Sequence, residues 1–389
     1  MMIVWTILNI VDWVLFILVA LSVVYIVFFS LASTRNKKFT YCPTKRKRSF
    51  LIIIPAYAED KVIIETASRM ESLTYPKELF NAVVISDHHT EETNAKLNQL
   101  PIQNIIATYD NSSKAKALKL AIQEQKGDYD QVVILDADNM VEPHFLEQLN
   151  TICDNGYSAI QCHRIASPTT QTAVSRLDAI SEEINNSIFR KGHINVGLSS
   201  ALIGSGMCFD YQWFKENVVH LSTAGEDKEL EQSLLQQRIH VHYAEDLFVY
   251  DEKVKKSGNF QQQRRRWIAA QFYALSVMMS QISTALKPIN WDYLDKTYQQ
   301  AILPRLINIF LLVVLSFIVT TISPAHGIKW TVMTFCFFIA MYIAIPRYYK
   351  NRQTIKALLE IPKLIMLTIL NMFHLKGAAK KFIHTEHGE

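Results

Sequence analysis

Long uncharged segments lie near both ends of this chain, and they differ in pattern from the region between them. Residues 13–33 contain no charged side chain over 21 positions. At 1.5 Å per residue, a helix of that length crosses a bilayer core. Two further uncharged runs, 306–322 and 330–346, flank a Ser-Pro-Ala-His-Gly sequence at 323–327 that predicts a tight turn. We therefore expect an N-terminal membrane anchor and a C-terminal transmembrane hairpin.

Between these segments, short apolar runs alternate with amphipathic ones. The apolar runs predict strands at 50–54, 82–85, 105–108 and 132–135. The amphipathic runs predict helices at 60–71, 91–98, 114–125 and 143–153. This alternation is typical of α/β proteins, in which helices cover both faces of a mainly parallel sheet. Such sheets bind ligands at the carboxyl ends of their strands, so polar residues directly after strands are the first candidates for a site.

Basic residues follow the first apolar run at 35–48 and the third at 347–352. Positively charged flanks stay in the cytosol, so the anchor enters the membrane with its N-terminus outside. We expect a multi-pass protein of the plasma (inner) membrane with its α/β region in the cytosol. The lipid bilayer is then a partner of the chain.

Five segments follow from these patterns. They are an N-terminal transmembrane anchor at 1–33, a cytosolic α/β domain at 34–267, an interfacial amphipathic helix region at 268–300, a transmembrane hairpin at 301–348, and an interfacial or re-entrant helix with a basic cytosolic tail at 349–389. Residues 268–281 fit a helix on the membrane surface and a plain core helix equally well. Whether the apolar run 364–373 spans the membrane stays open.

Charge and cysteine content exclude several classes of protein. Lys and Arg number 40 against 36 Asp and Glu, and a net charge of +4 is too small for a nucleic-acid binder. Hydrophobic residues make up 49% of the chain, which excludes a mainly disordered protein. The five cysteines are scattered and include no CxxC pair, so neither a zinc site nor a disulfide framework is indicated.

Acidic side chains follow three of the predicted strands. Glu59 and Asp87 come after the first two, and Asp136-Ala137-Asp138 follows the apolar run 132–135. A lone Asp after a strand is usually a turn or cap residue. In an extended segment, however, Asp136 and Asp138 point to the same side, and two carboxylates with substrate phosphates can hold Mg²⁺ or Mn²⁺.

Two further motifs carry chemistry. Gly225-Glu226-Asp227 opens a helical stretch, where acids either stabilise the helix dipole or supply a general base.

In Gln263-Arg264-Arg265-Arg266-Trp267, the first, fourth and fifth residues share a helix face that suits a phosphate and a sugar. The alternative for this cluster is contact with anionic lipid headgroups, which we expect for Arg264 and Arg265.

These motifs, in this order, resemble the membrane-bound family 2 glycosyltransferases, the group that includes cellulose, hyaluronan and poly-N-acetylglucosamine synthases. The matching elements are PAYAE at 55–59, Asp87, SKAKAL at 113–118, DAD at 136–138, GSG at 204–206, GED at 225–227 and QRRRW at 263–267. The resemblance implies a GT-A nucleotide-diphospho-sugar transferase fold and an inverting transfer. One departure is Gly225, where the family usually has a threonine or a similar residue.

The resemblance also implies roles by position. Donor-binding residues would be Ala56, Tyr57, Glu59, Asp87, Lys114, Asp136, Gln263, Arg266 and Trp267. Acceptor-binding residues would be Ser205, Gly206, Glu226 and Trp267. Asp136 and Asp138 would bind the metal, and Asp227 would be the catalytic base.

The leading hypothesis is therefore transfer of a hexose or N-acetylhexosamine from a UDP-sugar to a growing β-linked glycan of the exopolysaccharide or capsule type. The small number of predicted spans favours an alternative, the transfer of a single sugar to a lipid-linked acceptor. A third hypothesis is a non-catalytic membrane scaffold that binds a nucleotide sugar. The sugar, the linkage, self-association and an export partner are left open by the sequence.

Overall fold

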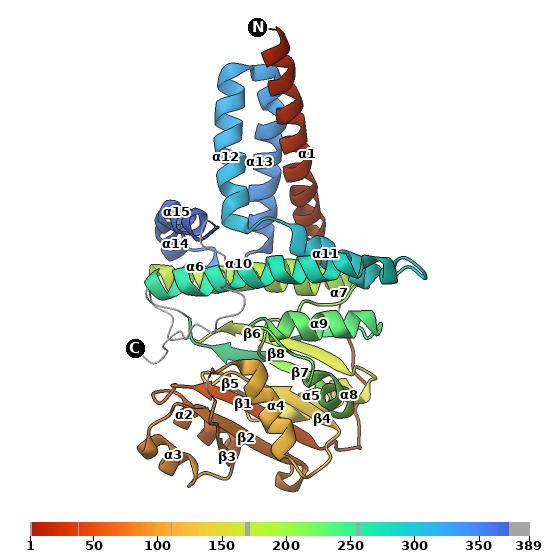
Figure 1. Cartoon of the computed structure of the whole chain (residues 1–389), viewed down its shortest axis with the longest axis vertical. Coiled ribbons are helices and arrows are strands. Elements are labelled where there is room, and N and C mark those ends of the chain that lie inside the picture. Colours follow the sequence, from red (N-terminus) through yellow and green to blue (C-terminus); the bar gives the residue numbers. More distant parts are fainter. Residues whose placement is uncertain (1, 38, 110, 168–171, 254–256, 373–389) are drawn as a thin grey trace.

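The computed structural model describes residues 2–37, 39–109, 111–167, 172–253 and 257–372. The molecule is built in three tiers (Figure 1). A sheet with helices on both faces forms the lowest tier, a layer of helices lies across it, and three long helices stand on that layer. The predicted basic tail, residues 373–389, lies outside the described residues.

The sheet has eight strands in the order β3-β2-β1-β4-β7-β6-β8-β5. Their bounds are β1 Phe50–Tyr57, β2 Phe80–Asp87, β3 Gln103–Ile106, β4 Gln131–Ile134, β5 Met140–Val141, β6 Ala159–Ala166, β7 Met207–Asp210 and β8 Val241–Asp251. Strands β1 to β4 pair in parallel, as do β6 and β8, whereas β7 runs antiparallel to both of its neighbours. The α/β class is confirmed, and the sheet is mainly parallel as predicted, with β7 and β5 running antiparallel to their neighbours.

Strand β1 shows why its sequence is apolar throughout. Phe50, Ile52 and Ile54 join one hydrophobic cluster with α2 (Ile63–Arg69) and α5 (Phe145–Asp154). Leu51 and Ile53 point to the other face and pack with α4 (Lys114–Glu124), α8 (Tyr211–Val218) and α9 (Glu226–Gln236). Both faces are covered, so alternation of polar and apolar positions is lost. The small helix α3 (Glu91–Leu97) follows β2.

The middle tier contains helices from the segments that the sequence placed at the membrane surface and from residues 173–195 of the predicted α/β domain. They are α6 Ala173–Asn185, the π-helix Asn186–Gly192, α7 His193–Asn195, α10 Ser257–Ser280, α11 Trp291–Ala301, α14 Arg352–Ala357 and α15 Ile361–Met372. Helix α10 runs across the base of the three upright helices (Figure 1). The predicted domain boundary at 267 falls inside α10, so the QRRRW motif and the predicted interfacial segment form one helix.

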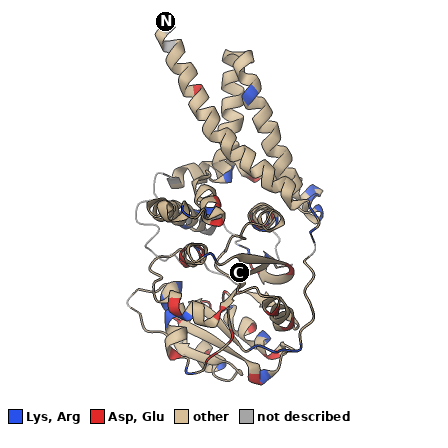
Figure 2. Cartoon of the chain, turned by 90° about the vertical axis from the view of Figure 1, so that its right-hand side faces the viewer, with Lys and Arg blue, Asp and Glu red and all other residues tan. Residues whose placement is uncertain are grey.

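Three helices of the described chain are long and apolar enough to cross a membrane: Trp5–Ser33 within α1 (Met2–Ser33), α12 Arg305–Ile322 and α13 Pro324–Ala344. Charged residues are few in this bundle and gather at its base and on the sheet domain (Figure 2). The predicted turn at 323–327 is shorter than expected. Pro324 already starts α13, because a proline fits the first turn of a helix without losing a hydrogen bond.

Polar contacts fasten the bundle at its far end. The Asp12 carboxylate accepts hydrogen bonds from Lys329 Nζ at 2.5 Å and Trp330 Nε1 at 2.7 Å, which joins α1 to α13.

At the near end, α1 packs against the middle tier. Asn195 Nδ2 donates to the carbonyl oxygens of Ala32 and Arg35 at 3.0 and 2.9 Å and so completes the last turn of α1. Gly192 faces the Phe29 carbonyl so closely that a Cβ would not fit between them. The anchor helix is thus part of the folded body.

Candidate active site

The carboxyl ends of β1 and β2 bring the first two motifs together. Tyr57 and Asp87 are partners in the parallel register, and the Ala58 N–H donates to the Asp87 carbonyl at 2.8 Å. Ala58 and His88 both have positive φ, which turns the chain sharply after each strand. The carboxylates of Glu59 and Asp87 are buried, and His88 Nδ1 lies 2.5 Å from Asp87 Oδ1.

A hollow of about 450 Å³ opens beside Asp87 at the ends of β2 and β3. Its lining includes Ser86, His88, His89, Asn94, Thr108 and Tyr109. Burial lowers the pKa of His89, whose Nδ1 lies 2.8 Å from the Ser86 hydroxyl, so this ring favours its neutral form. The sequence analysis did not name Tyr109 or His89 as candidate site residues. Tyr109 follows β3, and polar residues that follow strands were the first candidates for a site, so it could have been found. Ala56 is buried in β1 and does not line this hollow.

The Asp136-Ala137-Asp138 motif forms a turn rather than the extended segment that the sequence predicted. The Asn139 N–H donates to the Asp136 carbonyl at 3.1 Å and closes the turn. Asp136 and Asp138 therefore have different surroundings. Asp138 accepts from Asn139 Nδ2 at 3.2 Å and from the Glu252 N–H at 3.1 Å.

Lys114 joins the separate motifs into one site. Its ammonium donates to the Asp136 carboxylate and to the Gly204 carbonyl at 2.7 Å, and lies 3.8 Å from Glu226 Oε1. Burial opposes the charged form of this lysine, but the carboxylates of Asp136 and Glu226 outweigh burial and raise its pKa. Lys114 stands at the start of α4 after the Ser113 N-cap, which places the ammonium at the sheet edge.

Glu226 and Asp227 begin α9 beside this ammonium. Burial raises the pKa of Glu226 from 4.5 to about 7, partly offset by Lys114 and reinforced by Asp227. Arg266 also lowers the pKa of Glu226, so its charge acts at the site. The Asp227 carboxylate is 19% exposed and lies 3.9 Å from Lys228 Nζ. Asp227 is thus the more accessible of the two acids.

An ionic network that the sequence did not reveal lies behind the turn. Arg164 Nη1, on β6, lies 3.9 Å from Asp136 Oδ2 and 4.0 Å from Asp251 Oδ1. Its Nη2 donates to Glu182 Oε2 at 2.9 Å. Burial disfavours a charged Glu182, but Arg164 and the neighbouring cations hold its pKa well below the usual range. Asp251 ends β8, so the strand-end rule could have found it.

The carboxylates fit a hard divalent cation that shares its shell with a substrate. Asn139 Nδ2 donates to both Asp138 Oδ1 and Asp251 Oδ1 at 3.2 Å and holds the two carboxylates near one another. No cluster of three or more His, Cys, Asp or Glu side chains that could hold a metal occurs within the described ranges. A cation bound at Asp138, with Asp136 or Asp251, would therefore need phosphate or water oxygens to complete its shell, as Mg²⁺ usually does.

Two expected acceptor contacts are buried in the structure. The Ser205 side chain is fully buried, and its hydroxyl donates to Asn139 Oδ1. Gly206 has φ +61°, and a Cβ there would lie 3.0 Å from Val249 Cγ2. Ser205 thus positions Asn139, and the acceptor role of both residues stays a prediction.

The arginines of the basic motif on α10 have different surroundings. Arg264 Nη2 donates to Asp178 Oδ1 and to the Ser181 hydroxyl, both at 3.1 Å, on α6. Its guanidinium also lies 5.0 Å from the Trp267 ring centre. Arg264 thus has a carboxylate partner on α6, and the expectation that Arg264 and Arg265 contact lipid headgroups stays a prediction. Gln263 and Trp267 are partly buried on this helix, and the charge of Arg266 lowers the pKa of Glu226.

Comparisons with known proteins agree on the class. Residues 47–270 match the family model described as "Glycosyltransferase like family 2". A Bacillus subtilis (strain 168) protein named "Probable glycosyltransferase YdaM" is 32% identical over 98 residues, which cover 23% of this chain and 23% of that protein.

Two solved structures are also similar. The mannosyltransferase PcManGT from Pyrobaculum calidifontis, in complex with GDP-Man and Mn²⁺, aligns over 85% of this chain and 97% of its own, with a TM-score of 0.54 and 14% identity. Glucosyl-3-phosphoglycerate synthase from Mycobacterium tuberculosis, in complex with Mn²⁺, UDP and its product, covers 60% of this chain and 86% of its own, with a TM-score of 0.40 and 14% identity. The first alignment shows a shared GT-A fold. Because the family model spans more than half of the 389 residues, the chain belongs to the glycosyltransferase family 2 group.

Proposed function

We propose that the chain is a membrane-bound inverting glycosyltransferase that transfers a hexose or N-acetylhexosamine from a UDP-sugar to a growing β-linked glycan. One observation carries the proposal. The Lys114 ammonium contacts the carboxylate after β4 and lies 3.8 Å from the Glu226 carboxylate that opens α9. The residues proposed to bind the donor, at the ends of the strands, therefore lie beside those proposed to bind the acceptor, at the start of α9.

The donor half is made by the ends of β1, β2 and β4. The hollow beside Asp87 suits a nucleoside, while Lys114 and Arg266 bring positive charge toward the diphosphate. Mg²⁺ or Mn²⁺ bound at Asp138 and Asp136 would offset the negative charge of the leaving diphosphate. The Mn²⁺ named with both similar structures supports a divalent cation, and their GDP-mannose and UDP support a nucleotide-linked donor.

The acceptor half contains Asp227. Its carboxylate takes the proton of the acceptor hydroxyl while that oxygen attacks the anomeric carbon. The bond between this carbon and the diphosphate oxygen breaks on the opposite face, so an α-linked donor gives a β-linked product. Partial exposure of Asp227 allows a sugar hydroxyl to reach it, whereas buried Glu226 holds Lys114 in place.

The test uses membranes that contain the full chain, a panel of labelled nucleotide sugars, and Mg²⁺ or Mn²⁺. We expect transfer from a UDP-sugar. Asp227→Asn should lower the transfer rate about 10²–10⁴-fold because the proton acceptor is lost. Asp128→Asn, at a carboxylate that is 76% exposed on the surface, is the matched control. Full turnover by Asp227→Asn would contradict the assignment of the base.

A second candidate is the transfer of one sugar to a lipid-linked acceptor. The observation that favours it is the presence of only three candidate membrane spans in the described part of the chain. Product size decides between the two: a polymer of high mass supports glycan extension, and a single sugar in the organic extract supports the alternative. Donor binding without any transfer would support the non-catalytic scaffold instead.

A further inference from the structure

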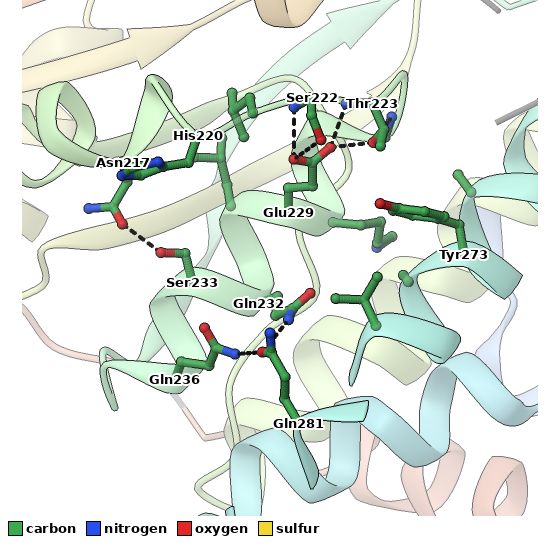
Figure 3. Close-up of a pocket in the computed structure, with 17 residues that line it drawn as sticks. Asn217, His220, Ser222, Thr223, Glu229, Gln232, Ser233, Gln236, Tyr273 and Gln281 are labelled. Carbon is green, nitrogen blue, oxygen red and sulfur yellow. Dashed lines mark hydrogen bonds between the residues drawn. The ribbon is translucent and has the colours of Figure 1, made fainter. Parts of the chain in front are cut away.

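A groove lies between α9 and α10, outside the donor and metal residues described above. Its volume is about 390 Å³, within the usual range for small-molecule sites. Helix α9 contributes one face, α10 contributes Ala270, Tyr273, Ala274 and Val277 at helical spacing, and Gln281 follows directly after α10. Figure 3 shows the Tyr273 ring directed into the groove across from Glu229.

The charged groups of the groove already have protein partners. Glu229 accepts the backbone N–H groups of Ser222 and Thr223 at 2.9 and 2.7 Å. Lys228 Nζ donates to the Leu202 carbonyl at 3.2 Å and lies 3.6 Å from Glu231 Oε2. Because Lys228 is paired with Glu231 and Glu229 already accepts two backbone hydrogen bonds, neither side chain favours an ionic ligand.

Amides, hydroxyls and one aromatic ring make up most of the remaining polar surface. Gln281 Oε1 accepts from Gln232 Nε2 at 3.0 Å and also from Gln236, so the three amides form a cluster at one end of the groove. Next to this cluster the Ser233 hydroxyl donates to Asn217 Oδ1 at 2.6 Å (Figure 3). Neutral groups that both donate and accept, beside the apolar face of Tyr273, suit an uncharged polyhydroxyl ligand.

The groove lies next to the transfer site along the chain, at Gly225 and Lys228, but does not coincide with it. Asp227 and Gln236 are nine positions apart on α9, which at 3.6 residues per turn places them on opposite sides of the helix. Gly225, just before the helix, lines the groove, and a Cβ there would lie 3.2 Å from Ala270 Cβ. Gly225 therefore lets α10 approach the start of α9 closely, directly beside Glu226 and Asp227.

We propose that this groove is a secondary glycan subsite, which holds neutral sugar units of the acceptor or product away from the site of transfer. The inference rests on the proposed function, because that function supplies a glycan at the N-terminus of α9. Occupancy at a distance from Asp227 would keep a growing chain attached between transfers.

The test measures binding of hexasaccharides to the full chain in lipid nanodiscs by titration calorimetry, without donor. The probes are β-linked hexamers of glucose and of N-acetylglucosamine, with an α-linked glucose hexamer for comparison. Tyr273→Ala and Gln236→Ala are each expected to weaken binding of a β-linked hexamer about tenfold, as loss of a central contact does. Tyr273→Phe keeps the ring and should bind within about twofold of the native chain.

Met279→Ala is the matched control, since Met279 is half exposed on α10 but does not line the groove. The inference is overturned if no hexamer binds, or if Tyr273→Ala and Gln236→Ala both bind as tightly as the native chain. Nucleotide release from a UDP-sugar is measured separately. Transfer without hexamer binding defeats the subsite alone, whereas hexamer binding without any transfer defeats the proposed function.

Discussion

Replacing Glu226 by glutamine should make the protein more stable at alkaline pH. The pKa of this buried carboxyl is about 7 in the folded chain, against an ordinary value of 4.5. Between these two pH values the folded state keeps a proton that the unfolded state has lost. Stability therefore falls as the pH rises from about 4.5 to 7 and stays low above that range. A glutamine side chain does not titrate in this range, so the stability of Glu226→Gln should not fall between pH 4.5 and pH 7.

The magnitude follows from the two pKa values. Each pH unit between them corresponds to about 1.4 kcal/mol, so the full effect is about 3 kcal/mol above pH 7. The Glu226 side chain is 8% exposed, so solvent screening reduces the value little. Lys114 loses one neighbour in the variant but keeps its hydrogen bonds to Asp136 and to the Gly204 carbonyl.

The assay is thermal unfolding of the detergent-solubilised full chain between pH 5 and pH 9. At about 1–2 °C per kcal/mol for a chain of 389 residues, the variant should unfold about 3–6 °C higher than the native chain at pH 8 and at nearly the same temperature at pH 5. Glu216→Gln, at an exposed carboxyl on α8, is the control and should follow the native curve. Parallel curves for Glu226→Gln and the native chain, or a less stable variant at pH 8, would refute the reasoning.

Three further outcomes are expected. Gly206→Ala should lower the free energy of unfolding by about 1–3 kcal/mol in denaturant titrations, because φ is +61° and Val249 lies 3.0 Å from the added carbon. Gly156→Ala is the comparison: φ is +91° and no atom lies within 4 Å of the added carbon, so its effect on stability comes from the backbone conformation alone. Asp12→Asn should lower the unfolding temperature because Lys329 loses its partner in a pair that is 15% exposed, at a cost of about 3 kcal/mol, and an unchanged temperature would contradict the pairing. Removal of divalent cations by EDTA should abolish sugar transfer, and Mn²⁺ or Mg²⁺ should restore it; full transfer in EDTA would exclude the metal assignment.

The sequence predicts the first half of the sheet well because that half is built locally. Strands β1, β2 and β4 are apolar on both faces, and β1 to β4 alternate with helices, so each appears as a separate run. The second half is different. Strand β7 lies between β4 and β6, and β5 pairs with β8 from more than 100 residues away. Such pairings leave no local signal, and the two antiparallel strands β5 and β7 were therefore not predicted.

The site residues differ in the same way: some follow strands that form locally, and others come together only through distant strand pairing. Asp87 and Asp136 were found because each directly follows a local strand. Arg164 and Asp251 were missed because their relation to Asp136 arises only when β6 and β8 pair. Residues 136–138 were predicted as extended because they directly follow an apolar strand. The hydrogen bond from the Asn139 N–H to the Asp136 carbonyl turns the chain there within four residues, and the sequence carries no clear signal for it.

The contact between Gly192 and the carbonyl of Phe29 has a mechanical consequence. A catalytic unit on a flexible tether would sample many heights and tilts above a bilayer. Here the last turn of the anchor is built into the body that carries the sheet, and Asn195 completes that turn. With the three long helices in lipid, helix packing rather than linker length sets how far Asp227 stands from the headgroups. Exchanging the anchor for an unrelated apolar helix should keep the protein on the membrane and still misplace its active centre.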